Sequence, residues 1–350
     1  MIVGLSHEVN QPEMKRLFSY DDIKGEPEEK QAKYLSPYLF DASGLKDRHS
    51  VLVETGATPN NRPLIVAGSQ PIDFGHYVMS TDDKNSFLAK EPQAEKFIIP
   101  YFGAREFLNG GEKWVLAPFK ANPNELKKMP YVLERVAQVR ASRERSKRKS
   151  TLVAAQYPKQ FGTAIIPEKE FIVIPKVSSE RRKYMPMGYV KPPSIPSDLV
   201  FVGADSSLSD FSILTSSTHM AWMRAVAGRL ESRYRYSIGV VYNTFPWPDL
   251  TDAAKATLTK TGQAILDARA AWPEATLADL YDPDSMPANL RKAHMANDKA
   301  VDKLYRKKPF ESERERVEHL FMLYEQLQAP LVAASKPKPR KRKARTVKTS

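Results

Sequence analysis

A carboxylate and two guanidinium groups stand close together in the segment Glu231-Ser232-Arg233-Tyr234-Arg235. If this segment is extended, residues 231, 233 and 235 point to the same side, because side chains alternate along a strand. A carboxylate accepts a hydrogen bond from the amine of cytosine, and an arginine donates two to the Hoogsteen edge of guanine. The three side chains therefore suit the reading of a base pair. The alternative is a surface ion pair of Glu231 with Arg233 or Arg235, worth under about 1 kcal/mol.

The stretch 211–248 positions these residues. Hydroxyl groups at Ser216, Ser217 and Thr218 suit the start of a helix. Apolar residues then recur at helical spacing, at Met220, Trp222, Met223, Val226 and Ala227. The run from Tyr234 to Tyr242 is rich in residues that favour strands and is closed by Pro246 and Pro248. We therefore expect a helix, a turn and a strand.

A second polar group follows a predicted buried strand at 171–175. It combines short hydroxyls with cations, which suits contacts with phosphate groups, and we name as candidate DNA-backbone contacts Lys176, Ser178, Ser179, Arg181, Arg182 and Lys183. A basic helical region after Pro123 adds Arg143 and Arg145 to this set. The alternatives are local capping and pairing for the first group and a solvated helix face for the second.

The composition limits the class of protein. The chain has 350 residues, 41% of them hydrophobic, and no apolar run long enough to span a membrane. Its amino terminus lacks the pattern of a signal peptide, and the absence of cysteine fits a reducing compartment, so we expect a cytoplasmic protein. Six scattered histidines without an H-x-x-x-H pair make no metal site, and we expect His294 to be a packed or capping residue.

The net charge of +13 is unevenly distributed. Eight lysines and arginines without an acid lie between Lys336 and Lys348, which leaves +5 for the rest of the chain. Such a tail can contact phosphates without sequence preference, or it can be a terminus without a role. The body is only mildly basic, so charge alone is weak support for DNA binding.

The predicted fold class is α+β, with four successive regions. Residues 1–25 hold short strands at 1–5 and 15–20, and 26–248 form a mixed α/β domain. Within it Gly68 to Gly75 predicts a turn, since the glycine spacing fits neither of the common phosphate-binding loops. Asn109-Gly110-Gly111 predicts a reversal between two strands within 97–116. Residues 249–328 form a small helical domain, and 329–350 a disordered basic tail.

Four stretches carry a resemblance to a known family: 97–116, 174–189, 211–248 and 265–304. They resemble the carboxyl-terminal part of MmeI-like restriction–modification enzymes, in which one chain carries nuclease, adenine methyltransferase and DNA-reading parts. The resemblance covers most of 1–328 and implies that 26–248 is a target-recognition domain. It also implies that 1–25 follows a methyltransferase domain that is missing here.

The family's catalytic motifs do not appear in this chain. An adenine methyltransferase of this kind requires an Asp/Asn-Pro-Pro-Tyr/Phe tetrad that holds the flipped base. The only Pro-Pro pair, Pro192-Pro193, stands in Lys-Pro-Pro-Ser. No nuclease-like constellation and no glycine-rich S-adenosylmethionine site is recognisable either. We therefore expect no catalytic residue, no metal and no cofactor here, with S-adenosylmethionine bound only by the missing domain.

The resemblance implies a role for each of the three charged residues in the segment 231–235. Glu231 and Arg233 occupy the family's paired base-reading positions and would specify one C·G pair, while Arg235 matches a third reading position. The chain would choose the DNA site for an adenine-specific methyltransferase domain or subunit encoded upstream, with double-stranded DNA as its partner. The alternatives are a standalone DNA-binding regulator or decoy, and an enzyme with an unrecognised site.

Overall fold

The computed structural model describes residues 12–19, 25–58 and 62–335, with side chains through 328. The chain divides into two compact units, one of Met1–Val51 with Arg314–Ser350 and one of Leu52–Glu313. In the described ranges no helix has the length and apolar character needed to cross a membrane. The same ranges contain no group of three His, Asp or Glu residues that could hold a metal ion.

The first unit pairs the amino-terminal segment with the last helix of the chain. Strands β1 (Lys15–Ser19) and β2 (Glu28–Ala32) form an antiparallel hairpin, which confirms the strand predicted at 15–20, and a 3-10 helix spans Ala42–Gly44. Helix α11 (Glu313–Ser335) buries Val317, Leu320, Phe321 and Tyr324, whereas Leu327 is exposed. The ring of Phe321 on α11 packs against Phe40, with 4.6 Å between centroids. The strand predicted at 1–5 and the basic part of the tail, 336–350, lie outside the described residues.

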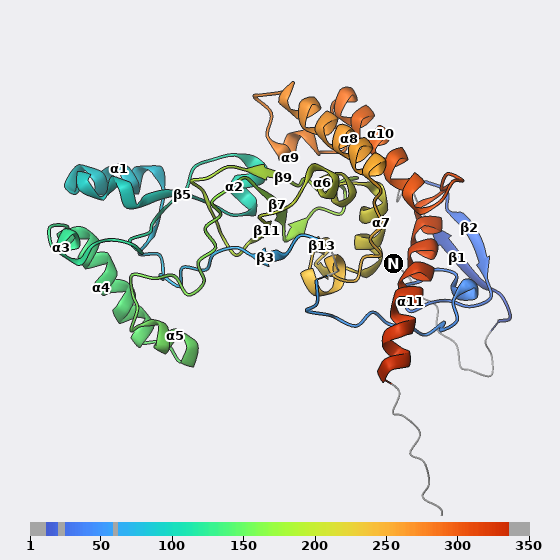
Figure 1. Ribbon diagram of the computed structural model, residues 1–350, viewed down its shortest axis with the longest axis horizontal. Coiled ribbons are helices and arrows are strands. Elements are labelled where there is room, and N and C mark those ends of the chain that lie inside the picture. Colours follow the sequence, from blue (N-terminus) through green and yellow to red (C-terminus); the bar gives the residue numbers. More distant parts are fainter. Residues whose placement is uncertain (1–11, 20–24, 59–61, 336–350) are drawn as a thin grey trace, which may run out of the picture. The chain divides into compact units, whose positions relative to one another are not determined.

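The second unit contains three small sheets, which confirms the α+β class (Figure 1). The first sheet has the order β10-β5-β6-β4 and the second β3-β11-β7-β9. Their strands are β3 (Ile65–Ala67), β4 (Val78–Met79), β5 (Ile98–Phe102), β6 (Trp114–Leu116), β7 (Phe171–Pro175), β9 (Gly188–Val190), β10 (Ile195–Pro196) and β11 (Val200–Gly203). The third sheet has the order β12-β13-β8, with strands β8 (Val177–Ser178), β12 (Gly228–Leu230) and β13 (Arg233–Arg235).

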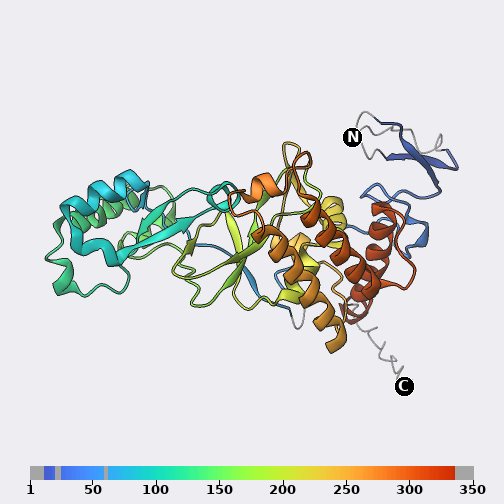
Figure 2. The same cartoon turned by 90° about the horizontal axis from the view of Figure 1, so that it is seen from above.

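Helices surround these sheets. Those before β7 are α1 (Thr81–Lys90), α2 (Ala104–Asn109), α3 (Pro123–Leu126), α4 (Pro130–Glu144) and α5 (Lys149–Ala154), with a 3-10 helix at Pro92–Phe97. Those after β11 are α6 (Leu208–Leu214), α7 (Ser217–Val226), α8 (Asp252–Ala270), α9 (Leu277–Leu280) and α10 (Ala288–Tyr305). Helices α8 and α10 run side by side in both views, which confirms the predicted helical region after Pro248 (Figure 2).

Strand β7 is one of the two central strands of the second sheet. All five of its residues are buried, as the β-branched run predicted, and it pairs antiparallel with β11 on one side and β9 on the other. Phe171, Val173, Val200 and Val202 form an apolar cluster with the half-buried Phe102 and Phe107. Because β8 follows β7 after one residue, this buried core fixes the start of the polar segment at 176–183.

The stretch Gly68 to Gly75 turns only at its end, where the His76 amide donates to the Asp73 carbonyl at 3.1 Å. Its first residues are extended and leave no room for a phosphate. The backbone amides of Gly68, Ser69 and Gln70 donate to carbonyl groups of Val200, Pro196 and Thr163, at 3.1, 2.7 and 2.9 Å. A Cβ atom at Gly68 would lie 2.2 Å from the carbonyl oxygen of Ser197, so only glycine fits this close approach.

Two predictions of secondary structure were incomplete or wrong. Strands β5 and β6 pair antiparallel as predicted for 97–116, but helix α2 stands between them, before the reversal at Gly110 and Gly111. The run Ile238–Tyr242 is a π-helical turn and not a strand. Tertiary contacts override its strand preference, since the Tyr242 hydroxyl donates to the Pro63 carbonyl at 2.7 Å and Gly239 accepts from the Thr55 amide at 3.1 Å.

The buried guanidinium of Arg143 joins the end of α4 to two other segments. Arg143 is 0% exposed. Its nitrogens donate to five backbone carbonyls at 2.8–3.2 Å, those of Pro71, Ile72, Ala154, Tyr157 and Gln160. Arg143 therefore stabilises the fold, and its assignment as a DNA-backbone contact was wrong, because a phosphate cannot reach it in this arrangement.

We expect Arg143→Ala to lower the free energy of unfolding by more than about 3 kcal/mol, since several charged hydrogen bonds of about 1.5–3 kcal/mol each are lost. Urea unfolding and hydrogen exchange at α4 and α5 measure this loss. Arg140→Ala, in the same helix but exposed, is the control and should change the stability by less than about 0.5 kcal/mol. Equal losses in the two variants would contradict the role of Arg143.

Candidate nucleic-acid interface

The structure brings the two predicted polar segments together in one small sheet. Strand β13 pairs antiparallel with β12 and with β8, so that Tyr234 lies opposite Ser178 and Arg235 opposite Val177. The segment 176–183 therefore lies beside the hairpin of β12 and β13. Residues more than 50 positions apart in the sequence thus share one three-stranded sheet.

The exposed face of β13 carries two arginines. Tyr234 is buried, whereas its neighbours Arg233 and Arg235 are both exposed. This alternation follows from the period of two along a strand, and it confirms that residues 233 and 235 share a side. The side chain of Arg235 forms no hydrogen bond or ion pair with any residue in the described ranges, so its donors are available to a ligand.

Glu231 occupies the turn of the hairpin and not the strand, so the prediction of three residues along one strand was wrong. With Ser232 it forms the two-residue loop between Leu230 and Arg233. Its φ is +57°, a left-handed conformation that a glycine adopts more easily. The loop thus places the carboxylate at the tip of the hairpin, next to the exposed face of β13.

Glu231 and Arg233 form an ion pair across this tip. The distance from Arg233 Nη2 to Glu231 Oε2 is 2.6 Å, and the side chains are 47% and 77% exposed. A pair this exposed is worth at most about 1 kcal/mol. The surface ion pair that was the alternative interpretation is therefore present, and its low free energy allows both groups to exchange it for contacts with a ligand.

Two residues that the sequence argument did not single out brace the hairpin. The guanidinium of Arg229 lies 3.8 Å from the ring centroid of Tyr234, and Nη1 donates to the Ser232 carbonyl at 3.2 Å. The Ser232 hydroxyl donates to Glu180 Oε1 at 2.9 Å, which ties the tip to the 176–183 segment. The Glu180 amide and this hydroxyl lower the pKa of the Glu180 carboxyl, with help from Arg233 and Arg229.

Among the predicted backbone contacts, Ser178 was assigned wrongly. It is 2% exposed, and its hydroxyl has no hydrogen-bond partner among the described residues. As a residue of β8 it faces the interior, and only a change of the strand would expose it. Ser179 is half-buried, and its hydroxyl accepts from the Arg181 amide at 3.3 Å, which is local capping.

The cations of this segment differ in their accessibility. Lys183 is exposed, and Arg181 is exposed but paired with Asp284 at 2.5 Å. Burial lowers the pKa of the Arg182 guanidinium. Burial also lowers the pKa of the Lys176 ammonium; the charge of Asp198 opposes this effect and that of Arg235 adds to it. The Lys176 ammonium lies 4.7 Å from the ring centroid of Phe201. Arg145 lies elsewhere, exposed at the end of α4, with Nη2 3.5 Å from the Ser142 hydroxyl.

A carboxylate of the helical region holds the segment 176–183 and the start of α7 in place. Asp298 on α10 accepts from the Tyr184 hydroxyl at 2.6 Å and from the Ser217 amide at 2.8 Å. Tyr184 directly follows the 176–183 segment, and Ser217 begins α7, which leads into β12. Burial raises the pKa of the Asp298 carboxyl, although these two donors oppose the effect.

Neighbouring contacts strengthen this link. Helix α7 begins at the predicted place, with Ser216 as N-cap, and Thr218 donates to Asp302 at 2.6 Å. Arg224 near its end donates to the carbonyls of Arg182 and Lys183 at 3.1 and 3.2 Å. His294 is buried and stacks on the Tyr184 ring at 4.0 Å, which confirms it as a packed residue.

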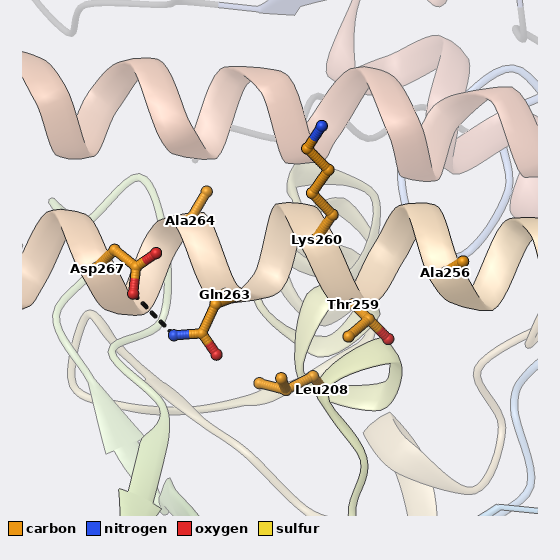
Figure 3. Close-up of a pocket in the computed structure, with 7 residues that line it drawn as sticks. All are labelled: Leu208, Ala256, Thr259, Lys260, Gln263, Ala264 and Asp267. Atoms are coloured by element: carbon orange, nitrogen blue, oxygen red, sulfur yellow. Dashed lines mark hydrogen bonds between the residues drawn. The ribbon is translucent and has the colours of Figure 1, made fainter.

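A shallow pocket between α6 and α8 offers no alternative site. It has a volume of about 630 Å³ and is lined by Leu208, Ala256, Thr259, Lys260, Gln263, Ala264 and Asp267. Gln263 and Thr259 point to the side of Leu208, while Lys260 points away from it (Figure 3). The only polar contact drawn there is the hydrogen bond from Gln263 to Asp267 at 2.8 Å. The pocket therefore lacks a cluster of convergent polar groups.

Comparison with known proteins identifies the family. Residues 47–249 match the target recognition domain of MmeI, and residues 250–332 match the MmeI C-terminal domain. The chain belongs to the MmeI family. The resemblance carried by the four sequence stretches is thereby confirmed, together with the relation to restriction–modification DNA methyltransferases.

Two relatives define how much of such a protein the chain represents. The chain is 36% identical to DNA methyltransferase A of Bacillus subtilis (strain 168) over 294 aligned residues. These residues are 84% of this chain and 33% of that protein. The solved structure of the Type IIL restriction-modification enzyme MmeI in complex with DNA is 35% identical with a TM-score of 0.84. That match covers 92% of this chain and 42% of the MmeI chain. The chain thus spans less than half the length of either relative.

We expect Asp298→Ala to lower the free energy of unfolding by about 2–4 kcal/mol, because the Ser217 amide and the Tyr184 hydroxyl lose their acceptor. Urea unfolding measures the change, and Asp298→Asn should recover part of it, since its carbonyl oxygen still accepts from Ser217. The control is Lys299→Ala, exposed on the same helix, with a change under about 0.5 kcal/mol. If Asp298→Ala matches this control, Asp298 does not hold the two segments.

Proposed function

We propose that this chain is the sequence-specific DNA recognition part of an adenine-specific DNA methyltransferase of restriction–modification type, with double-stranded DNA as its partner. The observation that carries the proposal is the hairpin of β12 and β13. It exposes Arg233 and Arg235 on one face, with Glu231 at its tip, beside the basic segment 176–183. The membership of the MmeI family supports it, since MmeI itself has been solved in complex with DNA.

The hairpin has the chemistry to read base edges. A two-stranded ribbon fits the major groove of B-DNA, where each base pair presents a distinct pattern of donors and acceptors. Arg233 would donate to guanine O6 and N7, and Glu231 would accept from the cytosine amine of the same pair. Arg235 reads or braces a neighbouring base. The ion pair between Glu231 and Arg233 opens on binding at a cost of at most about 1 kcal/mol.

The neighbouring cations would hold the duplex in register. Phosphate contacts supply affinity and orientation without sequence information. Lys176, Arg181, Arg182 and Lys183 are placed beside the hairpin, and Arg181 would exchange Asp284 for a phosphate. Ser179 contributes through its backbone turn, and Arg145 contacts the duplex from α4. Arg143 and Ser178 are left out because both are buried.

The chemistry of methyl transfer is assigned to a domain outside this chain. The catalytic tetrad and a recognisable S-adenosylmethionine site are missing from the sequence, and the chain matches only part of its relatives. We propose that 26–248 reads the DNA and that 249–328 supports it, through contacts such as that of Asp298. A methyltransferase domain or subunit encoded upstream would flip and methylate adenine.

We expect the chain to bind duplex DNA with an affinity that falls steeply with salt, because each phosphate contact adds roughly 0.9 to the slope of log K against log salt. Fluorescence anisotropy titrations at salt concentrations of roughly 50 to 300 mM measure this slope. The purified chain should transfer no labelled methyl group from S-adenosylmethionine to the same DNA. Methyl transfer, or an absence of DNA binding at low salt, would overturn the proposal. Binding without any associated methyltransferase would favour a regulator or decoy.

We expect the charge swap Glu231→Lys with Arg233→Asp to change the preference at one base pair, with a loss of roughly 1–3 kcal/mol for the original site. Selection from randomised duplexes measures the preference of the wild type and the variant. A matched control swaps the exposed ion pair of Lys308 and Glu311, 2.8 Å apart, by Lys308→Glu with Glu311→Lys. An unchanged site preference in the first variant would place base reading elsewhere.

A further inference from the structure

A dense group of cations surrounds the turn between α4 and α5. The ten residues from 140 to 149 contain five exposed cations, Arg140, Arg145, Lys147, Arg148 and Lys149, and one acid, Glu144. We call these five residues the α4–α5 cation surface. In Figure 1 the two helices lie at one end of the second unit, away from the label of β13. The surface is therefore separate from the hairpin that carries the proposed base readers.

None of these five cations forms an ion pair within the described residues. Exposed cations elsewhere do find carboxylates, for example Arg16 with Glu29 and Lys308 with Glu311, at 2.6 and 2.8 Å. Like charges that lie close together repel each other, and here no carboxylate offsets that repulsion by pairing. A surface that concentrates such charges without local compensation is complementary to a polyanion.

The backbone beneath this surface is fixed. The guanidinium of Arg143 donates to the carbonyls of Ala154, the last residue of α5, and Tyr157, just beyond it, at 2.8 and 3.2 Å. It also holds the Pro71 carbonyl at 2.8 Å, which anchors the end of α4 to the body of the unit. The cations on either side of Arg143 thus project from a turn whose shape is set before any ligand binds.

We propose that the α4–α5 cation surface is a second, sequence-independent binding surface for the phosphodiester backbone of duplex DNA. The inference rests on the proposed function and adds a contact remote from the base-reading hairpin. This surface sets affinity, because neutralised phosphates release counterions whatever the sequence. The hairpin sets the choice of site, because only base edges differ between sequences.

An anionic membrane is the competing partner. Helix α5 exposes Leu152 and Val153 next to the cations, and lipid binding would use both apolar and charged groups. Duplex DNA requires only the cations. The charge density without pairing favours DNA, and the two partners predict different results for variants of the apolar residues.

The test uses Arg148→Gln with Lys149→Gln. We expect the slope of log K against log salt to fall by about 2 and the affinity at 0.1 M salt to fall at least about tenfold, equally for preferred and random duplexes. The matched control is Lys127→Gln with Lys128→Gln, two exposed lysines after α3 that remove the same charge. This control should keep the wild-type slope. Circular dichroism and thermal unfolding verify that both variants fold.

The other possible results would contradict either the proposed function or the role of the α4–α5 cation surface. If the wild type binds no duplex, the proposed function fails. If the wild type binds and Arg148→Gln with Lys149→Gln keeps its slope, or if the lysine control falls equally, the α4–α5 surface is not a phosphate site. A membrane partner predicts another pattern. Phosphatidylserine vesicles would then bind the wild type, but they would bind neither Arg148→Gln with Lys149→Gln nor Leu152→Ser with Val153→Ser. Both double variants would keep the DNA binding of the wild type.

Discussion

The carboxylate of Asp298 is the contact on which the arrangement of the segment 176–183 and the hairpin of β12 and β13 depends. It accepts from Tyr184 at the end of one basic segment and from Ser217 at the start of the helix that leads into the hairpin. A half-buried carboxylate with two donors fixes the positions of both, because releasing either would leave a polar group without a partner. The helical region of this MmeI-family chain thus holds the segment 176–183 and the hairpin of β12 and β13 in place.

This support explains how the hairpin of β12 and β13 can be exposed and still ordered. The hairpin strands have three residues each and bury little, so a hairpin of this size is marginal by itself. It gains order from β8, from the hydrogen bond between Ser232 and Glu180, and from Arg229 on the Tyr234 ring. Its charged tip is exposed and lies outside the core, so the Glu231–Arg233 ion pair can change partners without affecting the core.

Arginine has two opposite roles in this molecule. Arg143 is buried and saturated with carbonyl acceptors, whereas Arg145, two residues later, is exposed. The planar guanidinium suits both roles, since it can satisfy several fixed acceptors in the interior and can bind phosphates or guanine at the surface. Neighbouring arginines in one basic segment therefore cannot be assigned a common function from their sequence spacing.

Local sequence determined the buried strand at 171–175, the helix that starts after Ser216 and the helices after Pro248, because apolar periodicity and capping act over a few residues. Motifs of the family also indicated the polar segments that meet beside β13. Tertiary structure alone decided that Arg143 and Ser178 are buried, that Glu231 lies in a turn and that 238–242 is a π-helical turn. These outcomes depend on distant partners, such as the carbonyl of Pro63 for Tyr242, which no local pattern of residues specifies.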